Sequence, residues 1–129
     1  MASVEITKDN IKAEVEAHDI SILDFWAPWC APCKAFGPTF EAVSENHPDI
    51  LFGKINTQEQ EALAYHYNIR SIPTLIIIRE GLLLYSEPGA LAEQDLESLI
   101  GQIKALDMVE LHAEADRLRA EEAEKAGNA

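Results

Sequence analysis

The sequence has no long apolar segment, few basic residues and only two cysteines. The longest apolar runs, Thr74–Ile78 and Leu82–Tyr85, are far shorter than the ~20 residues needed to span a bilayer. Residues Met1–Asn10 lack the basic and apolar regions of a secretory signal, so we expect a cytoplasmic protein. Ten basic against 23 acidic residues give a net charge of −13, so neither nucleic acid nor a membrane surface is an expected partner.

Two cysteines, Cys30 and Cys33, are too few for the disulfide framework of a small secreted protein. A bond between them would close a loop too short to constrain the unfolded chain much. A zinc site would need a second pair of ligands, but there is no third cysteine and the four histidines are scattered. The pair is therefore predicted to carry out chemistry, and we expect no bound metal.

Strand-like and helix-like patterns alternate along the chain, which predicts an α/β sandwich with a mixed sheet. Strands are expected at Ser3–Ile6, Ile20–Trp26, Ile50–Asn56, Thr74–Arg79 and Leu82–Ser86. The last two strands are separated only by Glu80-Gly81, which predicts an antiparallel hairpin. Helices are expected after a Thr7 cap, from Cys30 to at least Val43, and over Glu59–Tyr67. Pro38 lies inside the second of these helices and should kink it, and apolar positions from Leu96 to Leu106 predict a closing amphipathic helix.

Residues 107–129 differ in composition from the domain expected over residues 1–106. They are rich in alanine, glutamate and arginine, and they contain few large aliphatic side chains. Helix propensity is high but the apolar stripe is thin, which predicts a helical C-terminal extension. Three placements stay open: continuation of the preceding helix, docking onto the domain, or binding to another chain, with self-association as one case.

The segment Trp29–Lys34 (WCAPCK) follows a buried strand and opens a helix. At a helix N-terminus, unpaired backbone N–H groups and the helix dipole favour the ionised thiolate of Cys30. The spacing places Cys33 one turn away, close enough to bond to that sulfur. Because thiolates attack disulfides, the segment predicts thiol–disulfide exchange.

Three segments together resemble the thioredoxin family. Asp24–Lys34 (DFWAPWCAPCK) is similar to the family's active-site segment, which usually reads WCGPCK. Ile69–Thr74 (IRSIPT) resembles the segment that carries its cis-proline, and Pro88–Leu91 resembles the turn that closes its substrate groove. The resemblance covers residues 3–106 in order. It implies a thioredoxin fold, with a mixed sheet of about five strands flanked by helices, to which this chain adds a C-terminal helix.

The resemblance also implies roles for the two cysteines. Cys30 would attack a protein disulfide and Cys33 would resolve the mixed disulfide, with only Cys30 exposed. No bound cofactor is implied, and the implied partners are disulfide-containing proteins and an NADPH-dependent thioredoxin reductase. Ala31 and Ser71 stand where glycine is common in the family, which could alter the redox potential and the approach of the reductase.

Asp24 is a carboxylate in an otherwise apolar strand, so desolvation is expected to raise its pKa. The residues alone leave open a structural, hydrogen-bonded aspartate. The resemblance implies a proton acceptor for Cys33, with Lys54 beside it. A lysine in an apolar strand is costly unless it is paired, so pairing between Asp24 and Lys54 is expected.

Taken alone, Pro73 is equally consistent with an ordinary turn and with a cis bond after Ile72. The resemblance implies the cis form, which would expose the backbone of Ile72 for strand-like pairing with a substrate. It also implies two further groups near Cys30. The apolar groove would include Trp29, Gly89 and Ala90, and the supporting residues would be Trp26 and Pro32.

The leading function is therefore reduction of protein disulfides. The alternative is a thioredoxin-fold interaction module, chaperone-like in kind, whose groove and C-terminal tail bind a specific partner. An oxidase or isomerase would need export and would favour a histidine between the cysteines, where this chain has Ala31-Pro32.

Overall fold

The computed structural model describes residues 2–127 and has alternating strands and helices. In order they are β1 (Val4–Glu5), α1 (Ile11–Glu16), β2 (Ile20–Trp26), α2 (Ala31–Glu45), β3 (Leu51–Asn56), α3 (Glu61–His66), β4 (Thr74–Arg79), β5 (Leu82–Pro88), α4 (Glu93–Lys104) and α5 (Met108–Gly127). The predicted α/β architecture is confirmed. No helix within residues 2–127 has the length and hydropathy of a membrane-spanning segment.

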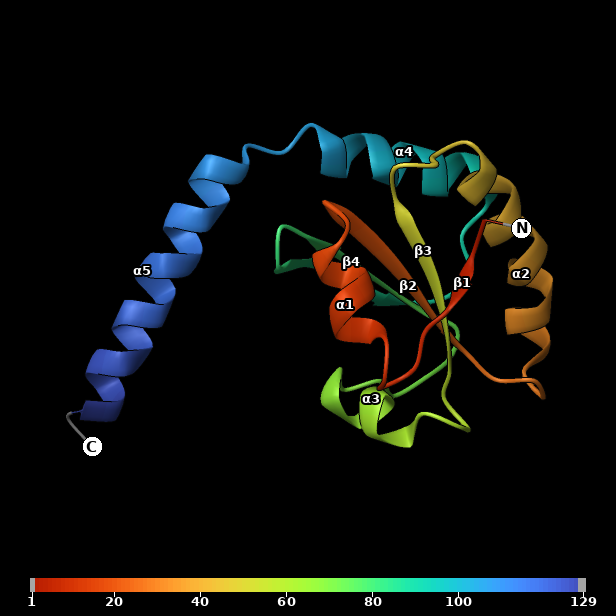
Figure 1. Ribbon diagram of the computed structural model, residues 1–129, viewed down its shortest axis with the longest axis horizontal. Coiled ribbons are helices and arrows are strands. Elements are labelled where there is room, and N and C mark those ends of the chain that lie inside the picture. Colours follow the sequence, from red (N-terminus) through yellow and green to blue (C-terminus); the bar gives the residue numbers. More distant parts are fainter. Residues whose placement is uncertain (1, 128–129) are drawn as a thin grey trace.

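A five-stranded mixed sheet forms the centre of the molecule, in the order β1-β3-β2-β4-β5 (Figure 1). Strands β1 and β2 run parallel to β3, whereas β4 runs antiparallel to both β2 and β5. The central strand β2 is buried along its length except at Trp26, which is half-buried. An apolar run can occupy this position because helices cover the sheet on both faces.

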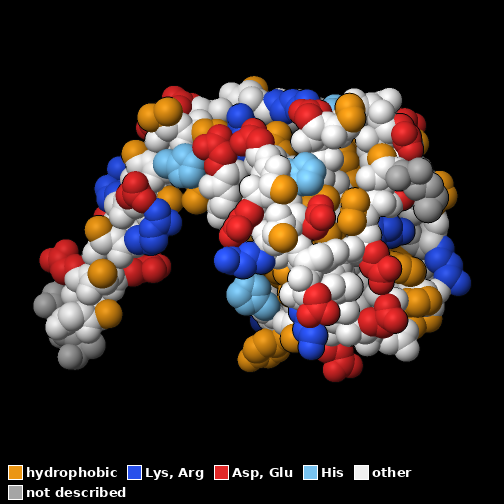
Figure 2. Space-filling view, in the orientation of Figure 1, with side chains coloured by type: hydrophobic (Ala, Val, Ile, Leu, Met, Phe, Trp, Pro, Cys, Tyr) orange, Lys and Arg blue, Asp and Glu red, His pale blue; other side chains and the backbone are white. Residues whose placement is uncertain are grey.

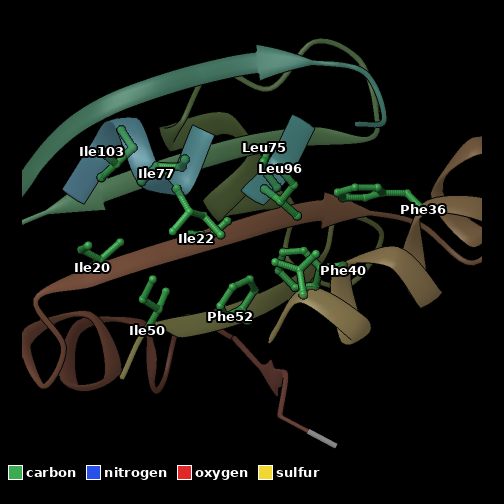
Figure 3. Packing of buried hydrophobic residues seen from close by; sticks show 12 residues of the cluster. Ile20, Ile22, Phe36, Phe40, Ile50, Phe52, Leu75, Ile77, Leu96 and Ile103 are labelled. Carbon is green, nitrogen blue, oxygen red and sulfur yellow. The ribbon is translucent and has the colours of Figure 1, made fainter. Parts of the chain in front are cut away.

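The two faces of the sheet carry different helices. On one face, α2 and α4 bring Phe36, Phe40 and Leu96 against the sheet residues Ile22 and Phe52 (Figure 3). The Phe40 and Phe52 rings lie edge to face, with centroids 5.2 Å apart. On the other face, α1 and α3 pack on a second apolar cluster. This double cover fixes the carboxyl end of β2, from which the chain enters α2.

Two helix starts differ from the sequence prediction. Thr7 does not cap α1, because Asn10 takes the N-cap position and its side-chain oxygen accepts a hydrogen bond from the Thr7 N–H at 2.7 Å. The helix predicted from Glu59 begins at Glu61. There, the N–H groups of Glu59 and Gln60 both donate to the carbonyl of Asn56 and form a turn first.

Helix α5 is separate from α4 and stands away from the body of the molecule (Figures 1 and 2). Its start is anchored: Asp107 accepts a hydrogen bond from the Glu110 N–H, and Met108 is only 8% exposed. One turn later, His112 Nε2 lies 2.9 Å from a carboxylate oxygen of Glu80, in the turn between β4 and β5. Beyond this His112–Glu80 contact the helix is exposed, and Leu118 is 50% accessible. Of the three placements considered for the C-terminal extension, the structure shows docking onto the domain, and only the first two turns of α5 take part in it.

Candidate active site

Cys30 and Cys33 form a disulfide at the start of α2. Cys30 occupies the N-cap position with an extended backbone, and its sulfur accepts a hydrogen bond from the Cys33 N–H at 3.2 Å. Pro32 lies in the first turn, where its missing N–H would have no helical partner in any case. The sequence therefore places one sulfur where the helix offers unpaired N–H donors.

The prediction that Cys30 is exposed is wrong for this disulfide form. Cys30 is 5% accessible and Cys33 2% accessible. Both belong to a small cluster with Ala27, against which Trp26 and Ile72 pack. The carbonyl oxygen of Ile72 lies 3.8 Å from the Cys30 sulfur. Access to this sulfur is thus limited by a segment more than forty residues further along the chain.

The Ile72–Pro73 peptide bond is cis, as the family resemblance implied. The N–H of Gly89 donates to the carbonyl of Pro73 at 2.8 Å, which ties the two predicted groove segments together. Gly89 has a φ of +108°, which a residue with a Cβ rarely adopts. Ala90 follows it on the exposed surface.

Trp29 is 69% exposed, beside the disulfide in the chain. It lines a hollow of about 340 Å³ together with Ile72 and the residues Thr57, Ala64, Ile69, Arg70 and Ser71. Gly89 and Ala90 do not line this hollow, but Gly89 is hydrogen-bonded to Pro73, which directly follows the lining residue Ile72. Arg70 adds a cation that sequence reasoning missed. The sequence feature that could have identified Arg70 as a groove residue is its position two residues before Ile72.

Asp24 is fully buried in the middle of the sheet. It lies in register with Lys54 on β3 and with Leu75 on β4. No side-chain or backbone donor among residues 2–127 reaches either of its carboxylate oxygens. Burial raises the pKa of Asp24 to about 7, although the Lys54 ammonium acts in the opposite direction. The raised pKa is confirmed, and no donor among residues 2–127 supplies the hydrogen bond that a structural aspartate would accept.

Lys54 is half-buried and does not form the expected ion pair with Asp24 at contact distance. Its ammonium instead lies 4.7 Å from the centroid of the Trp26 ring, a distance typical of a cation–π contact. Trp26 therefore contacts both the disulfide cluster and the lysine. Lys54 therefore lowers the pKa of Asp24 as a nearby positive charge, without a direct ion pair.

Comparison with known proteins agrees with this geometry. The thioredoxin family model matches residues 2–102. A "Putative thioredoxin 2" of Streptomyces coelicolor is 46% identical over 110 residues, which cover 85% of this chain and 82% of that protein. A thioredoxin of Porphyra purpurea is 38% identical over 104 residues, which cover 79% of this chain and 97% of that protein.

Among solved structures, a mutant thioredoxin from Halobacterium salinarum NRC-1 superimposes with a TM-score of 0.73 at 29% sequence identity. The match covers 83% of this chain and 98% of that one. The family match spans most of the sequence and includes both cysteines. This chain therefore belongs to the thioredoxin family and, with its Cys30–Cys33 pair, is a thiol–disulfide oxidoreductase.

Proposed function

We propose that this protein reduces disulfides in other proteins and is returned to its dithiol form by an NADPH-dependent thioredoxin reductase. The observation that carries the proposal is the Cys30 sulfur at the N-cap of α2, where it accepts the Cys33 N–H hydrogen bond at 3.2 Å. Once the disulfide is reduced, the same donor and the helix dipole favour a thiolate at this sulfur. A thiolate held in this way is a nucleophile at neutral pH.

The exchange takes two steps. The Cys30 thiolate attacks a substrate disulfide, one substrate sulfur leaves as a thiolate, and a mixed disulfide forms. Cys33 then loses its proton and attacks the Cys30 sulfur, which releases the second substrate sulfur and forms the Cys30–Cys33 disulfide. The substrate gains two electrons, and the reductase later supplies two electrons and two protons to the protein. Covalent catalysis of this kind divides one exchange into two easier steps.

Asp24 is the proposed acceptor of the Cys33 proton in the second step. A pKa of about 7 leaves both its charged and its neutral form populated near neutral pH, which suits transfer in either direction. Lys54 supplies the nearby positive charge that limits how far burial raises this pKa. The substrate backbone is proposed to pair with Ile72, next to the exposed ring of Trp29.

The reduction potential of the Cys30–Cys33 pair tests the direction of the reaction. We expect a value of about −270 mV, as in thioredoxin. The reason is that Ala31-Pro32 places no positive charge between the cysteines. Equilibration with glutathione or dithiothreitol buffers, followed by alkylation and mass analysis, gives this value. A result near about −120 mV would indicate an oxidant instead. We place the reductase function in a reducing compartment such as the cytoplasm.

A second candidate function rests on the exposed length of α5. An interaction module would use this helix and the groove to bind a specific partner, with turnover as a side reaction. Two cysteines joined at a helix N-cap are not required for binding alone, so the reductase remains the better-supported function. We propose that residues 107–129 are an accessory extension of a catalytic domain over residues 1–106.

A chain that ends at Leu106 distinguishes these two functions. We expect its turnover to equal that of the full chain, because α5 is anchored to the β4–β5 turn through His112 and Glu80. Loss of the buried Met108 should lower the free energy of unfolding by about 1–2 kcal/mol. Insulin reduction and solution mass, measured on both chains, provide the comparison. A large fall in turnover or a change of oligomeric state would favour the interaction module.

A further inference from the structure

A pocket of about 290 Å³ opens on the face of the sheet that carries Asp24, at strands β1 and β3. We call it the Lys54 pocket; its lining is Ser3, Glu5, Trp26, Lys54, Asn56 and Glu59. Lys54 is the one cation in this lining, and it is accompanied by two carboxylates. The pocket therefore links solvent to the lysine that influences Asp24.

Strand register places Glu5, Lys54 and Asp24 in one row. Glu5 on β1 is the parallel partner of Lys54 on β3, and Lys54 is the parallel partner of Asp24 on β2. Residues in register on paired strands point to the same face of a sheet. Because neighbouring strands lie about 4.8 Å apart, the two acidic residues are about 10 Å apart across the row, with the lysine between them.

The three residues of this row differ in burial. Glu5 is exposed, Lys54 is half-buried and Asp24 is fully buried. The Lys54 ammonium forms no ion pair with either carboxylate and lies over the Trp26 ring instead. Helix α2 passes close by, because a Cβ built at Gly37 would be 3.6 Å from the ammonium. A flexible ammonium between two carboxylates, bonded to neither, can move toward either of them.

We propose that Glu5 is a positioning residue that competes with Asp24 for the Lys54 ammonium and thereby sets the pH range in which Asp24 exchanges its proton with Cys33. The inference rests on the proposed function, because it concerns the proton transfer of that reaction. Glu5 acts in two ways. It draws the ammonium outward toward solvent, and it adds a negative charge to the field at Asp24.

The other charged and titratable groups near this row come from different elements. Glu59, in the turn after β3, lines the Lys54 pocket and acts in the same direction as Glu5, but it has no place in the strand register. Helix α2 contributes the Cys33 thiol in the reduced protein and, next to it, the exposed Lys34. It also carries Glu41, which is one turn beyond Gly37 and has a buried carboxylate oxygen without a hydrogen-bond partner among residues 2–127. Strand β4 presents the apolar Leu75 in register with Asp24.

The test is the substitution Glu5→Gln in the full chain. The titration of the Asp24 carboxyl carbon, followed by ¹³C NMR in the reduced protein, should move to lower pH by on the order of half a unit. The acid limb of the pH profile for insulin reduction should move in the same direction. Glu45→Gln is the matched control: it removes the same charge from an exposed position at the far end of α2 and should leave both curves in place.

A double-mutant cycle separates positioning from simple charge. In a Lys54→Met background, the effect of Glu5→Gln on the Asp24 titration should fall to less than half. An equal shift in both backgrounds, or no shift from Glu5→Gln alone, would overturn the proposal. If the wild-type chain failed to reduce insulin, the proposed function would be refuted, and the NMR titration would still decide whether Glu5 acts on Asp24 through Lys54.

Discussion

Replacement of Cys30 by serine should abolish insulin reduction, whereas replacement of Cys33 by serine should leave a protein that captures its substrate and retains it. The reason is the geometry of the α2 N-terminus, where only the Cys30 sulfur accepts the backbone hydrogen bond that favours a thiolate. Without Cys30 there is no first attack. Without Cys33 the first attack proceeds, but no thiol is within reach to displace the substrate.

Two measurements check this pair of variants. Insulin precipitation in dithiothreitol should occur with Cys30→Ser at the rate seen without protein, and intact mass analysis should find a covalent adduct only with Cys33→Ser. Each variant carries one serine for one sulfur, so each serves as the control for the other. Turnover by Cys30→Ser above the background rate would contradict the assignment of the nucleophile.

The substitution Asp24→Asn should stabilise the oxidised protein at neutral and alkaline pH by up to roughly 4 kcal/mol, because one unit of pKa is worth about 1.4 kcal/mol. Burial raises the pKa of Asp24 from its ordinary 3.8 to about 7 in the folded chain. Well below pH 3.8 the carboxyl is neutral in both the folded and the unfolded chain, so its ionisation contributes no difference in stability between the wild type and the variant. As the pH rises toward 7 the unfolded chain ionises first, so the wild-type protein loses stability relative to the variant.

Chemical denaturation of both proteins from pH 3.5 to pH 8.5 measures this difference. The two stabilities should differ least at the acid end, diverge between about pH 4 and 7, and then run parallel. Asp9→Asn, which changes an exposed aspartate in the turn before α1, is expected to shift stability little at any pH. A constant difference between wild type and Asp24→Asn across the range would show that Asp24 is ionised at its ordinary pKa.

The sequence predicted the sheet better than it predicted the helix starts, and the reason is physical. Strands β2 and β4 are apolar runs that only a doubly covered position can accommodate, so their pattern identified them. The starts of α1 and α3 depend instead on hydrogen bonds within turns, involving Asn10 and the carbonyl of Asn56. Several side chains could compete for those donors, and a linear pattern does not say which one succeeds.

The candidate site was predictable where it depends on neighbours in the chain. The cysteine pair, and Asp24 in its apolar strand, follow directly from local sequence. The position of Ile72 near the cysteines was implied only by the family resemblance, and the burial of Cys30 was not expected from the sequence. The ammonium of Lys54 was expected against Asp24 but lies over Trp26. The neighbourhood of Glu5 and Lys54 depends on strand register, which hydrophobic patterns alone do not specify.

The attachment of α5 to the domain is well separated from the cysteine pair. The helix is fastened to the turn between β4 and β5, whereas the disulfide lies where β2 passes into α2, and Figure 1 places α5 and α2 on opposite sides of the sheet. A dye, an affinity handle or a solid support joined through this helix would therefore not obstruct the approach of a substrate protein to the cysteine pair. The same separation would let a scaffold hold the protein by one side during repeated redox cycles at the other.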